Sequence, residues 1–421
     1  MSNVQPELAK PARLVSLDTY RGFVMLAMAS SGLALNNVAS NEELLAKFDN
    51  TGFAETWKWF LKVVSYELSH VTWTGCAAWD LIQPSFMFMV GVAIPYSFAR
   101  RKSLGDSYPK ILFHTILRSF LLIFLGVFLR SLGQEHTRFT YEDVLSQIGM
   151  GYTFVFLLQG RGLIVQSLAL IAILVGDWYL FYQHPLPSEG FDYATVGARD
   201  GHPLFTGYAA HWNKNTNFAH WFDAEAFGVG FLNLFPRQEK FLYNGGGYQT
   251  LNFIPSMATM LMGVMTGELL RGNKTSGQKL GTMIKYGFLC LALGMALDGT
   301  IWPYFDFTWT LCPIVKKIWT PTWAIFSTGW TLLLLSSFYW LIDYKGWKWL
   351  GFPFVVVGMN SIVMYVMSYT IKGWISQNLK THFGQDLFSG SAAPIIERSA
   401  QLFIMWLICL WLYRQKIFIR I

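Results

Sequence analysis

The sequence predicts an all-α membrane protein, a bundle of about ten transmembrane helices. Of the 421 residues, 53% are hydrophobic and only 14% are charged, and the mean hydropathy is +0.34. A soluble domain usually carries about a quarter charged residues. A helix needs roughly 20 mainly apolar residues to cross a bilayer. Ten apolar runs approach or reach that length, the fourth being short: 14–35, 80–99, 111–130, 145–158, 163–182, 251–270, 280–301, 321–342, 352–371 and 395–413.

Short clusters of Lys and Arg between these runs predict the orientation. Cytoplasmic loops of membrane proteins carry an excess of such residues, and an even number of spans brings both termini to the same side. With both termini in the cytoplasm, the inner segments hold Lys10, Arg13, Arg100, Arg101, Lys102, Lys110, Arg161, Arg271, Lys274, Lys279, Lys345, Lys348, Arg414, Lys416 and Arg420. The net charge of +7 is divided among these clusters, so we expect no nucleic-acid partner. The tail before the first run is polar and does not resemble a cleavable signal peptide.

We treat residues 1–421 as a single transmembrane domain with one long extracytoplasmic segment, about 183–250. This segment is rich in aromatic and amide side chains, which suit the apolar and polar faces of a sugar but also suit the membrane interface. We predict that it binds or covers an acceptor; packing at the interface is the alternative. Its candidate substrate-binding residues are His211, Asn213, Asn217, Asp223 and Tyr243. Three glycines at 245–247 are suited to a hinge or to a plain turn.

The second apolar run is preceded by a polar stretch with His70 and Trp73 and begins at Asp80. Imidazole titrates near neutral pH, so His70 is suited to act as a general base or a nucleophile. Asp80 could orient that ring, or could simply cap the start of the helix. Ten residues separate the two side chains. They can meet only if the polar stretch folds back over the helix.

Polar residues at the expected inner face form a second group of candidates. Asp18 and Arg21 are three residues apart, on one face of a helix. They either form an ion pair at the interface or line a cavity for an anionic cofactor. Asn360 and Ser361 interrupt the ninth apolar run, where packing between helices is the ordinary explanation.

Several common sites have no counterpart in the sequence. We find no P-loop, dinucleotide-binding fingerprint or HExxH motif. Cys76, Cys290, Cys312 and Cys409 lack the spacing of metal ligands, and His211 and His220 lie nine residues apart. We therefore expect no metal site.

Taken together, several motifs resemble those of the heparan-α-glucosaminide N-acetyltransferase family. They are RLVSLDTYRG at Arg13–Gly22, HVTWTGCAAWDLIQP at His70–Pro84, VLSQIG at Val144–Gly149, the small-residue run at Ile254–Gly267 and GMNS at Gly358–Ser361. The resemblance implies transfer of an acetyl group across a membrane, from cytosolic acetyl-CoA to the amine of a terminal glucosamine. It assigns the family's active-site histidine to His70 and the nearby aspartate to Asp80.

The function we predict is therefore an acetyl-CoA-dependent N-acetyltransferase that modifies an extracytoplasmic amino sugar or glycan. Acetyl-CoA is expected as co-substrate, membrane lipid as a partner, and a homodimer by analogy with the family. Candidate cofactor-binding residues are Asp18, Arg21, Arg100, Arg101, Asn360 and Ser361; Trp73 joins the substrate-binding group. A bacterial cytoplasmic membrane is the expected location. A glycan or lipid-linked-sugar transporter or flippase, and an O-acetyltransferase, are the alternatives.

Overall fold

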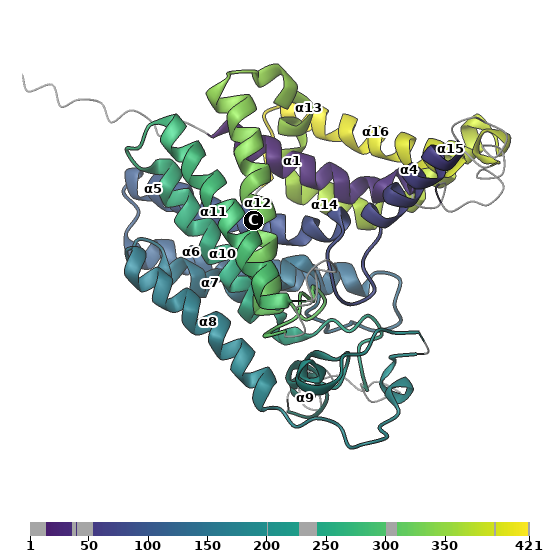
Figure 1. The fold of residues 1–421 in the computed structure, drawn as a ribbon. Helices are drawn as coiled ribbons and strands as arrows, with labels where there is room; N and C mark the ends of the chain where they lie inside the picture. Colours follow the sequence, from purple (N-terminus) through teal and green to yellow (C-terminus); the bar gives the residue numbers. More distant parts are fainter. Residues whose placement is uncertain are drawn as a thin grey trace, which may run out of the picture.

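The computed structural model describes residues 14–35, 39, 54–199, 201–226, 242–299, 310–390 and 393–419. In this part of the chain every regular element is a helix, apart from one isolated antiparallel bridge between Thr74 and Val315. The all-α prediction is confirmed (Figure 1).

The predicted apolar runs all become helices. These helices are α1 (Val15–Ser30), α5 (Ile82–Ser103), α6 (Tyr108–Ser131), α7 (Val144–Leu158), α8 (Leu163–Gln183), α10 (Phe253–Arg271), α11 (Ser276–Asp298), α12 (Pro321–Phe338), α13 (Lys348–Gly358) with α14 (Ser361–Thr370), and α16 (Ala393–Arg414). The remaining α-helices are α4 (Ala54–Glu67), α9 (Phe218–Trp221) and α15 (Lys372–Phe383). Short 3-10 or π segments are η1 (Ser31–Ala34), η2 (Ala78–Leu81), η3 (Tyr193–Val196), η4 (Gly207–Trp212), η5 (Phe222–Ala226), η7 (Thr250–Asn252), η8 (Tyr339–Tyr344) and η9 (Asp386–Phe388).

Seven helices of the described chain are long and apolar enough to cross a membrane, and α13 with α14, bent by 57°, makes an eighth if the pair is one span. This supports an integral membrane protein. The two other predicted spans are shorter than a bilayer crossing ordinarily needs. Helix α1 has 16 residues, because positive φ angles at Ser31–Ala34 end it, and α7 has 15.

Close helix crossings at small residues hold the bundle together. Helix α5 packs along α10, where Gly91 faces the Met260 carbonyl and Gly263 faces the Phe88 carbonyl so closely that a Cβ at either glycine would overlap the oxygen. Such contacts replace the hydrophobic driving force that lipid does not supply between helices. Helix α5 is thereby fixed at the centre of the bundle, with Asp80 close to its start and Arg100 near its end.

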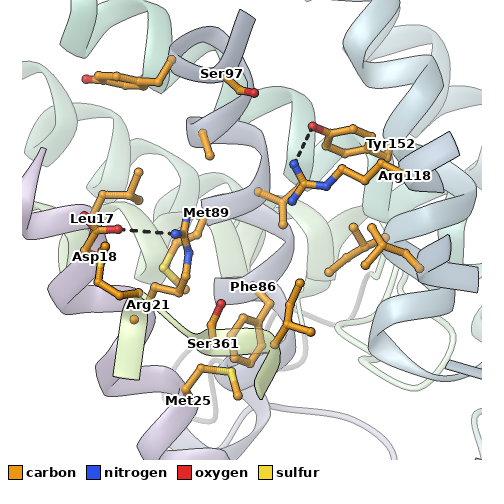
Figure 2. A pocket seen from close by; sticks show the side chains of 18 of the residues that line it. Leu17, Asp18, Arg21, Met25, Phe86, Met89, Ser97, Arg118, Tyr152 and Ser361 are labelled. Atoms are coloured by element: carbon orange, nitrogen blue, oxygen red, sulfur yellow. Dashed lines mark hydrogen bonds and ion pairs between the residues drawn. The ribbon is translucent and has the colours of Figure 1, made fainter. Parts of the chain in front are cut away.

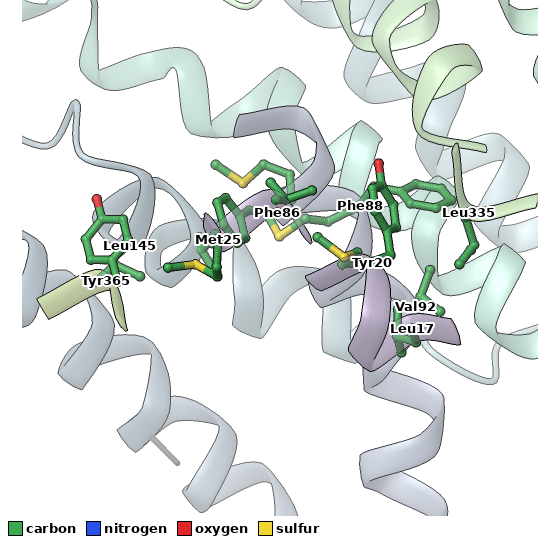
Figure 3. Packing of buried hydrophobic residues seen from close by; sticks show 14 of the residues in the cluster. Leu17, Tyr20, Met25, Phe86, Phe88, Val92, Leu145, Leu335 and Tyr365 are labelled. Atoms are coloured by element: carbon green, nitrogen blue, oxygen red, sulfur yellow. The ribbon is translucent and has the colours of Figure 1, made fainter. Parts of the chain in front are cut away.

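The main apolar core lies between α1, α5, α7 and α12. Figure 3 shows Tyr20 and Met25 of α1 beside Phe86 and Phe88 of α5, with Leu145 and Tyr365 at one side. The Tyr20 hydroxyl lies 2.7 Å from the Ser85 hydroxyl, so its buried polar atom is satisfied. This core fills the middle of the bundle, between the end at which α5 begins and the end at which α5 finishes.

A smaller core covers the end of the bundle at which α5 begins. It joins parts of the chain that are far apart in sequence: Trp73, Phe181, Trp212, Leu251, Val315 and Ile318. In Figure 1, helix α8 leads down to this region and to α9 at the bottom of the view. The described part of the predicted 183–250 segment packs here; residues 200 and 227–241 lie outside the described residues.

Candidate functional site

The structure brings His70 and Asp80 into contact at the start of α5. Residues 70–77 fold back over the helix, and His70 Nδ1 lies 2.7 Å from Asp80 Oδ1. The Asp80 side chain is 1% exposed, whereas that of His70 is 47% exposed. A buried carboxylate thus holds the imidazole at Nδ1, while the rest of the His70 ring remains accessible.

Asp80 also satisfies the backbone at the start of the helix. Its Oδ2 atom accepts hydrogen bonds from the N–H groups of Val71, at 3.3 Å, and Ala77, at 3.1 Å. Orienting His70 and capping the helix were alternative interpretations of the sequence, and the geometry accommodates both. The Asp80 carboxylate therefore holds both the backbone of residues 70–77 and the orientation of the His70 ring.

Lys316 is a third member of this group that the sequence did not point to. Its ammonium lies 3.0 Å from Asp80 Oδ1 and 3.1 Å from His70 Nδ1, and the residue is 4% exposed. Burial lowers the pKa of Lys316, and the charge of Asp80 acts against that shift. We call His70, Asp80 and Lys316 the His–Asp–Lys centre.

Backbone contacts hold the Lys316 segment against the His70 loop. The Thr74–Val315 bridge joins the two segments, and the Gly75 N–H donates to the Ile314 carbonyl at 3.0 Å. The Thr320 hydroxyl, which caps α12, accepts a hydrogen bond from the Val315 N–H at 3.1 Å. The position of Lys316 is therefore set by the start of α12 as well as by Asp80.

A polar cavity of about 440 Å³ has Thr72, two residues after His70 in the chain, in its wall. Arg199, His202 and Lys214 also line it, and none of its described lining residues is acidic. Burial, together with the charge of Arg199, lowers the pKa of Lys214. Burial also lowers the pKa of His202, with Lys214 and Lys317 acting in the same direction. We call this space the cationic cavity, and it favours an anionic occupant.

The predicted substrate-binding residues divide into two groups. Tyr243 lines the cationic cavity, and Trp73 lies beneath it, its indole donating to the Trp212 carbonyl at 3.1 Å and packing against His202. The others hold the 183–250 segment together. Asn213 and Asn217 are fully buried, and their amides bond to Phe205 and His220 within the segment.

Asp223 and His211 likewise contact their own segment and its neighbours. Asp223 accepts a hydrogen bond from the Thr250 N–H at 2.8 Å, and burial raises its pKa to about 6. The His211 ring packs against Tyr182 and Tyr208. The contacts of Asn213 and Asn217 favour a structural role, because a buried, bonded side chain has little left to offer a ligand. His211 is only partly buried, and one buried oxygen of Asp223 has no hydrogen-bond partner among the described residues.

A larger cavity of about 750 Å³ opens at the other end of the bundle. Asp18, Arg21, Arg100, Arg118 and Tyr152 supply charged and polar side chains to its wall. Figure 2 shows Arg21 and Arg118 on two sides of the space, Arg21 paired with Asp18 at 3.5 Å and Arg118 donating to the Tyr152 hydroxyl at 3.1 Å. We call it the arginine cavity. Asp18 and Arg21 thus form the predicted ion pair and also line a cavity.

The remaining predicted cofactor residues lie in different places. Ser361 lines the arginine cavity, but Arg101 is not among its lining residues and pairs with Asp106 at 3.4 Å. Asn360 is fully buried and holds the C-terminal segment, donating to the Ile417 carbonyl and accepting from the Ile419 N–H. Its amide is therefore occupied by the backbone, and Asn360 is not among the residues that line the arginine cavity.

Sequence reasoning missed Lys316 and Arg118. It also missed the basic residues of the cationic cavity: Arg199, His202 and Lys214. Arg118 carried a usable signal, since a charge within an apolar run is a candidate functional residue. Lys316 did not, because it lies beside Lys317 in a loop and looks like an ordinary surface residue. No group of three or more metal-ligating side chains occurs among the residues described here.

Comparison with curated proteins identifies relatives over nearly the whole chain. Heparan-alpha-glucosaminide N-acetyltransferase of Homo sapiens is 24% identical over 448 aligned positions, which cover 98% of this chain and 60% of the human protein. The Mus musculus protein of the same name is 23% identical, with coverage of 100% and 62%. The chain is therefore similar to heparan-alpha-glucosaminide N-acetyltransferases along nearly its whole length.

The chain spans about 60% of the length of these curated relatives. No family model matches it. The site contains an accessible imidazole on a buried carboxylate, a combination that can act in general base or nucleophilic catalysis.

Replacing Asp80 by Asn is expected to destabilise the protein by about 3 kcal/mol, because it leaves the buried Lys316 ammonium without its charge partner. Thermal unfolding in detergent measures the effect. Asp106→Asn is the control, since Asp106 pairs with Arg101 and Lys110 at the surface and such pairs contribute little. The double variant Asp80→Asn with Lys316→Met should recover part of the loss; strictly additive losses would contradict the pairing.

Proposed function

We propose that this protein transfers an acetyl group from acetyl-CoA, held in the arginine cavity, to an amine held beside His70. The observation that carries the proposal is the arrangement along α5: an arginine-lined cavity toward one end and an accessible histidine on a buried carboxylate at the other. The similarity to N-acetyltransferases along nearly the whole chain supports acyl transfer as the chemistry. The orientation predicted from the basic clusters would open the arginine cavity to the cytoplasm.

The arginine cavity suits a phosphorylated donor. Arg21, Arg100 and Arg118 outnumber the single acid Asp18 among the charged residues that line it. Guanidinium groups bind phosphate oxygens through paired hydrogen bonds, and a cavity with low-dielectric walls strengthens that attraction. Apolar side chains such as Met25 and Phe86 line its deep part, which suits the uncharged arm of CoA rather than its phosphates.

The donor must pass beyond the end of this cavity to react at His70. Phe86 lines the cavity and Asp80 lies six residues earlier in the chain, so the two are separated by about 10 Å along the helix. The intervening layer is the apolar core around Met25 and Phe86. We infer that the thioester arm displaces this layer when acetyl-CoA binds.

His70 supplies the proton chemistry. Its Nδ1 atom faces Asp80, so Nε2 is the nitrogen that meets substrate. In direct transfer, Nε2 takes a proton from the acceptor amine as the new N–C bond forms and the C–S bond breaks, and that proton then goes to the departing CoA thiolate. An amine is protonated near neutral pH, so it must first lose a proton to become a nucleophile.

A second route passes through an acetyl-enzyme. His70 Nε2 attacks the thioester carbonyl carbon, the C–S bond breaks and CoA leaves, and the amine then attacks the acetyl-imidazole. Asp80 offsets the positive charge that develops on the ring in both routes. The two routes differ in whether CoA is released before acceptor is present.

The cationic cavity supports an acceptor that carries negative charge as well as an amine. Three of its described lining residues, Arg199, His202 and Lys214, are basic. An acidic group of the acceptor would be attracted to them, and the same field would help the amine to lose its proton. The relatives' names specify heparan-alpha-glucosaminide as their substrate. We propose an acidic amino sugar for this chain.

Purified protein in detergent should release CoA from acetyl-CoA in the presence of an amino sugar, and faster with a sulfated or carboxylated one than with its neutral parent. His70→Ala should lower this rate by at least about 100-fold, because it removes the base. Thiol release and product mass measure both effects. A single burst of CoA without acceptor would favour the acetyl-enzyme.

Failure to bind or cleave acetyl-CoA with any acceptor would contradict the proposal. Two results would point to the alternatives. Transport of a glycan that persists in His70→Ala would favour a transporter or flippase. An acetyl ester in the product would favour an O-acetyltransferase.

Replacing Arg118 by Gln should raise the KM for acetyl-CoA several-fold with little change in kcat, because the substitution removes a phosphate partner far from the reacting atoms. Steady-state kinetics at fixed acceptor concentration provide the measurement. Arg161→Gln, at an exposed position between α7 and α8, is the control for loss of one positive charge. An unchanged KM in Arg118→Gln would exclude Arg118 from donor binding.

A further inference from the structure

We propose that Lys316 is a positioning residue that keeps the His70 imidazole neutral, by acting as the charge partner of Asp80 from within the buried side of the centre. The inference rests on the proposed function and deepens it, because it concerns the protonation state in which His70 meets its substrates. It adds a third residue to the pair expected from the sequence.

The contacts of the three side chains fix the hydrogen-bonding roles. Asp80 Oδ1, His70 Nδ1 and Lys316 Nζ form a triangle with sides of 2.7, 3.0 and 3.1 Å. An ionised carboxylate can only accept and an ammonium can only donate. The 2.7 Å contact then requires a proton on His70 Nδ1, which leaves the lone pair on Nε2. Lys316 does not donate a hydrogen bond to His70 in this tautomer. Both Lys316 and His70 donate to Asp80 Oδ1.

The charges follow from this arrangement. A carboxylate alone would favour the imidazolium form of His70, since an opposite charge within about 4–6 Å stabilises the charged form of a titratable group. A positive charge 3.1 Å from the same ring disfavours it. With Lys316 in place, the carboxylate is already paired, and the centre is electrically neutral when His70 is neutral. A neutral ring is the form that can take a proton or attack a thioester.

Burial makes the effect of Lys316 strong. The residue is 4% exposed and Asp80 is fully buried, so little water intervenes to screen one charge from the other. Burial lowers the pKa of Lys316, and the Asp80 carboxylate, 3.0 Å from the ammonium, acts against that shift. Its backbone is held by the Thr74–Val315 bridge and by the Thr320 hydroxyl that caps α12.

Other titratable groups surround the centre at greater distances. Tyr66, Glu67 and Cys76 face it from the His70 side, Tyr248 from the segment before α10, and Lys317 from the Lys316 segment. Glu67 accepts a hydrogen bond from the Ala78 N–H. Among the described residues, only Asp80 and Lys316 approach His70 Nδ1 within hydrogen-bonding distance.

The test measures the protonation of His70 directly. Diethyl pyrocarbonate reacts with neutral imidazole, and peptide mass spectrometry gives the rate of modification at His70, whose side chain is half exposed. The rate is followed between about pH 5 and 9 in detergent-purified protein, the range in which histidines titrate. Four proteins are compared: the wild type, Lys316→Met, Lys316→Arg and Lys317→Met.

In Lys316→Met, the midpoint of His70 modification should move to higher pH by about one unit or more, because one neighbouring positive charge is lost. Lys316→Arg retains the charge and should stay near the wild type. Lys317→Met removes an adjacent lysine that does not contact Asp80 or His70 through any hydrogen bond described here, and should shift the midpoint far less. When activity is measured, the acid limb of the kcat/KM profile should move in the same direction.

An unchanged midpoint in Lys316→Met, or one moved to lower pH, would overturn the proposal, and so would an equal shift in Lys317→Met. A purely structural role would lower stability without moving the midpoint. If Lys316→Met aggregates on size exclusion, Lys316→Gln takes its place under the same criteria. Because the reagent acts on His70 without acetyl-CoA, this outcome is independent of whether the wild type proves to transfer acetyl groups.

Discussion

A carboxylate without access to water must find donors, and Asp80 finds them in two separate parts of the chain, residues 70–77 and Lys316. The N–H groups of Val71 and Ala77 fold the polar stretch over the start of α5. That fold brings His70 into contact with Asp80. Lys316 reaches the same carboxylate from the loop before α12. The cost of burying a charge without partners is several kcal/mol, so this carboxylate determines how the surrounding segments meet.

The rest of the bundle arranges two cavities around that point. The cationic cavity is lined in part by Thr72 of the His70 loop, and the arginine cavity lies toward the other end of α5. Between them stands a core of methionine and aromatic side chains. Methionine adapts its shape easily, so this layer suits a barrier that an entering arm has to displace. The proposed reaction needs such a barrier, because an open path would let solutes leak across the membrane.

The sequence predicted the helices well because apolar composition alone determines where a chain enters a bilayer. It also identified His70 and Asp80, which lie close together in the chain beside one such helix. Lys316 could not be found in this way, since 236 residues separate it from Asp80 and no periodicity connects them. Asn213, Asn217 and Asn360 look like ligand contacts in the sequence, but each is buried and bonded to nearby backbone. A polar residue's partners depend on the tertiary fold, which composition does not reveal.

The central claim is that donor and acceptor react from opposite faces of the membrane. Proteoliposomes that contain a trapped acidic amino sugar, with labelled acetyl-CoA added only outside, test it most directly. The account predicts labelled acetyl-sugar inside the vesicles, and none in vesicles made with His70→Ala. Product that forms only when both substrates are on the same side would contradict the account.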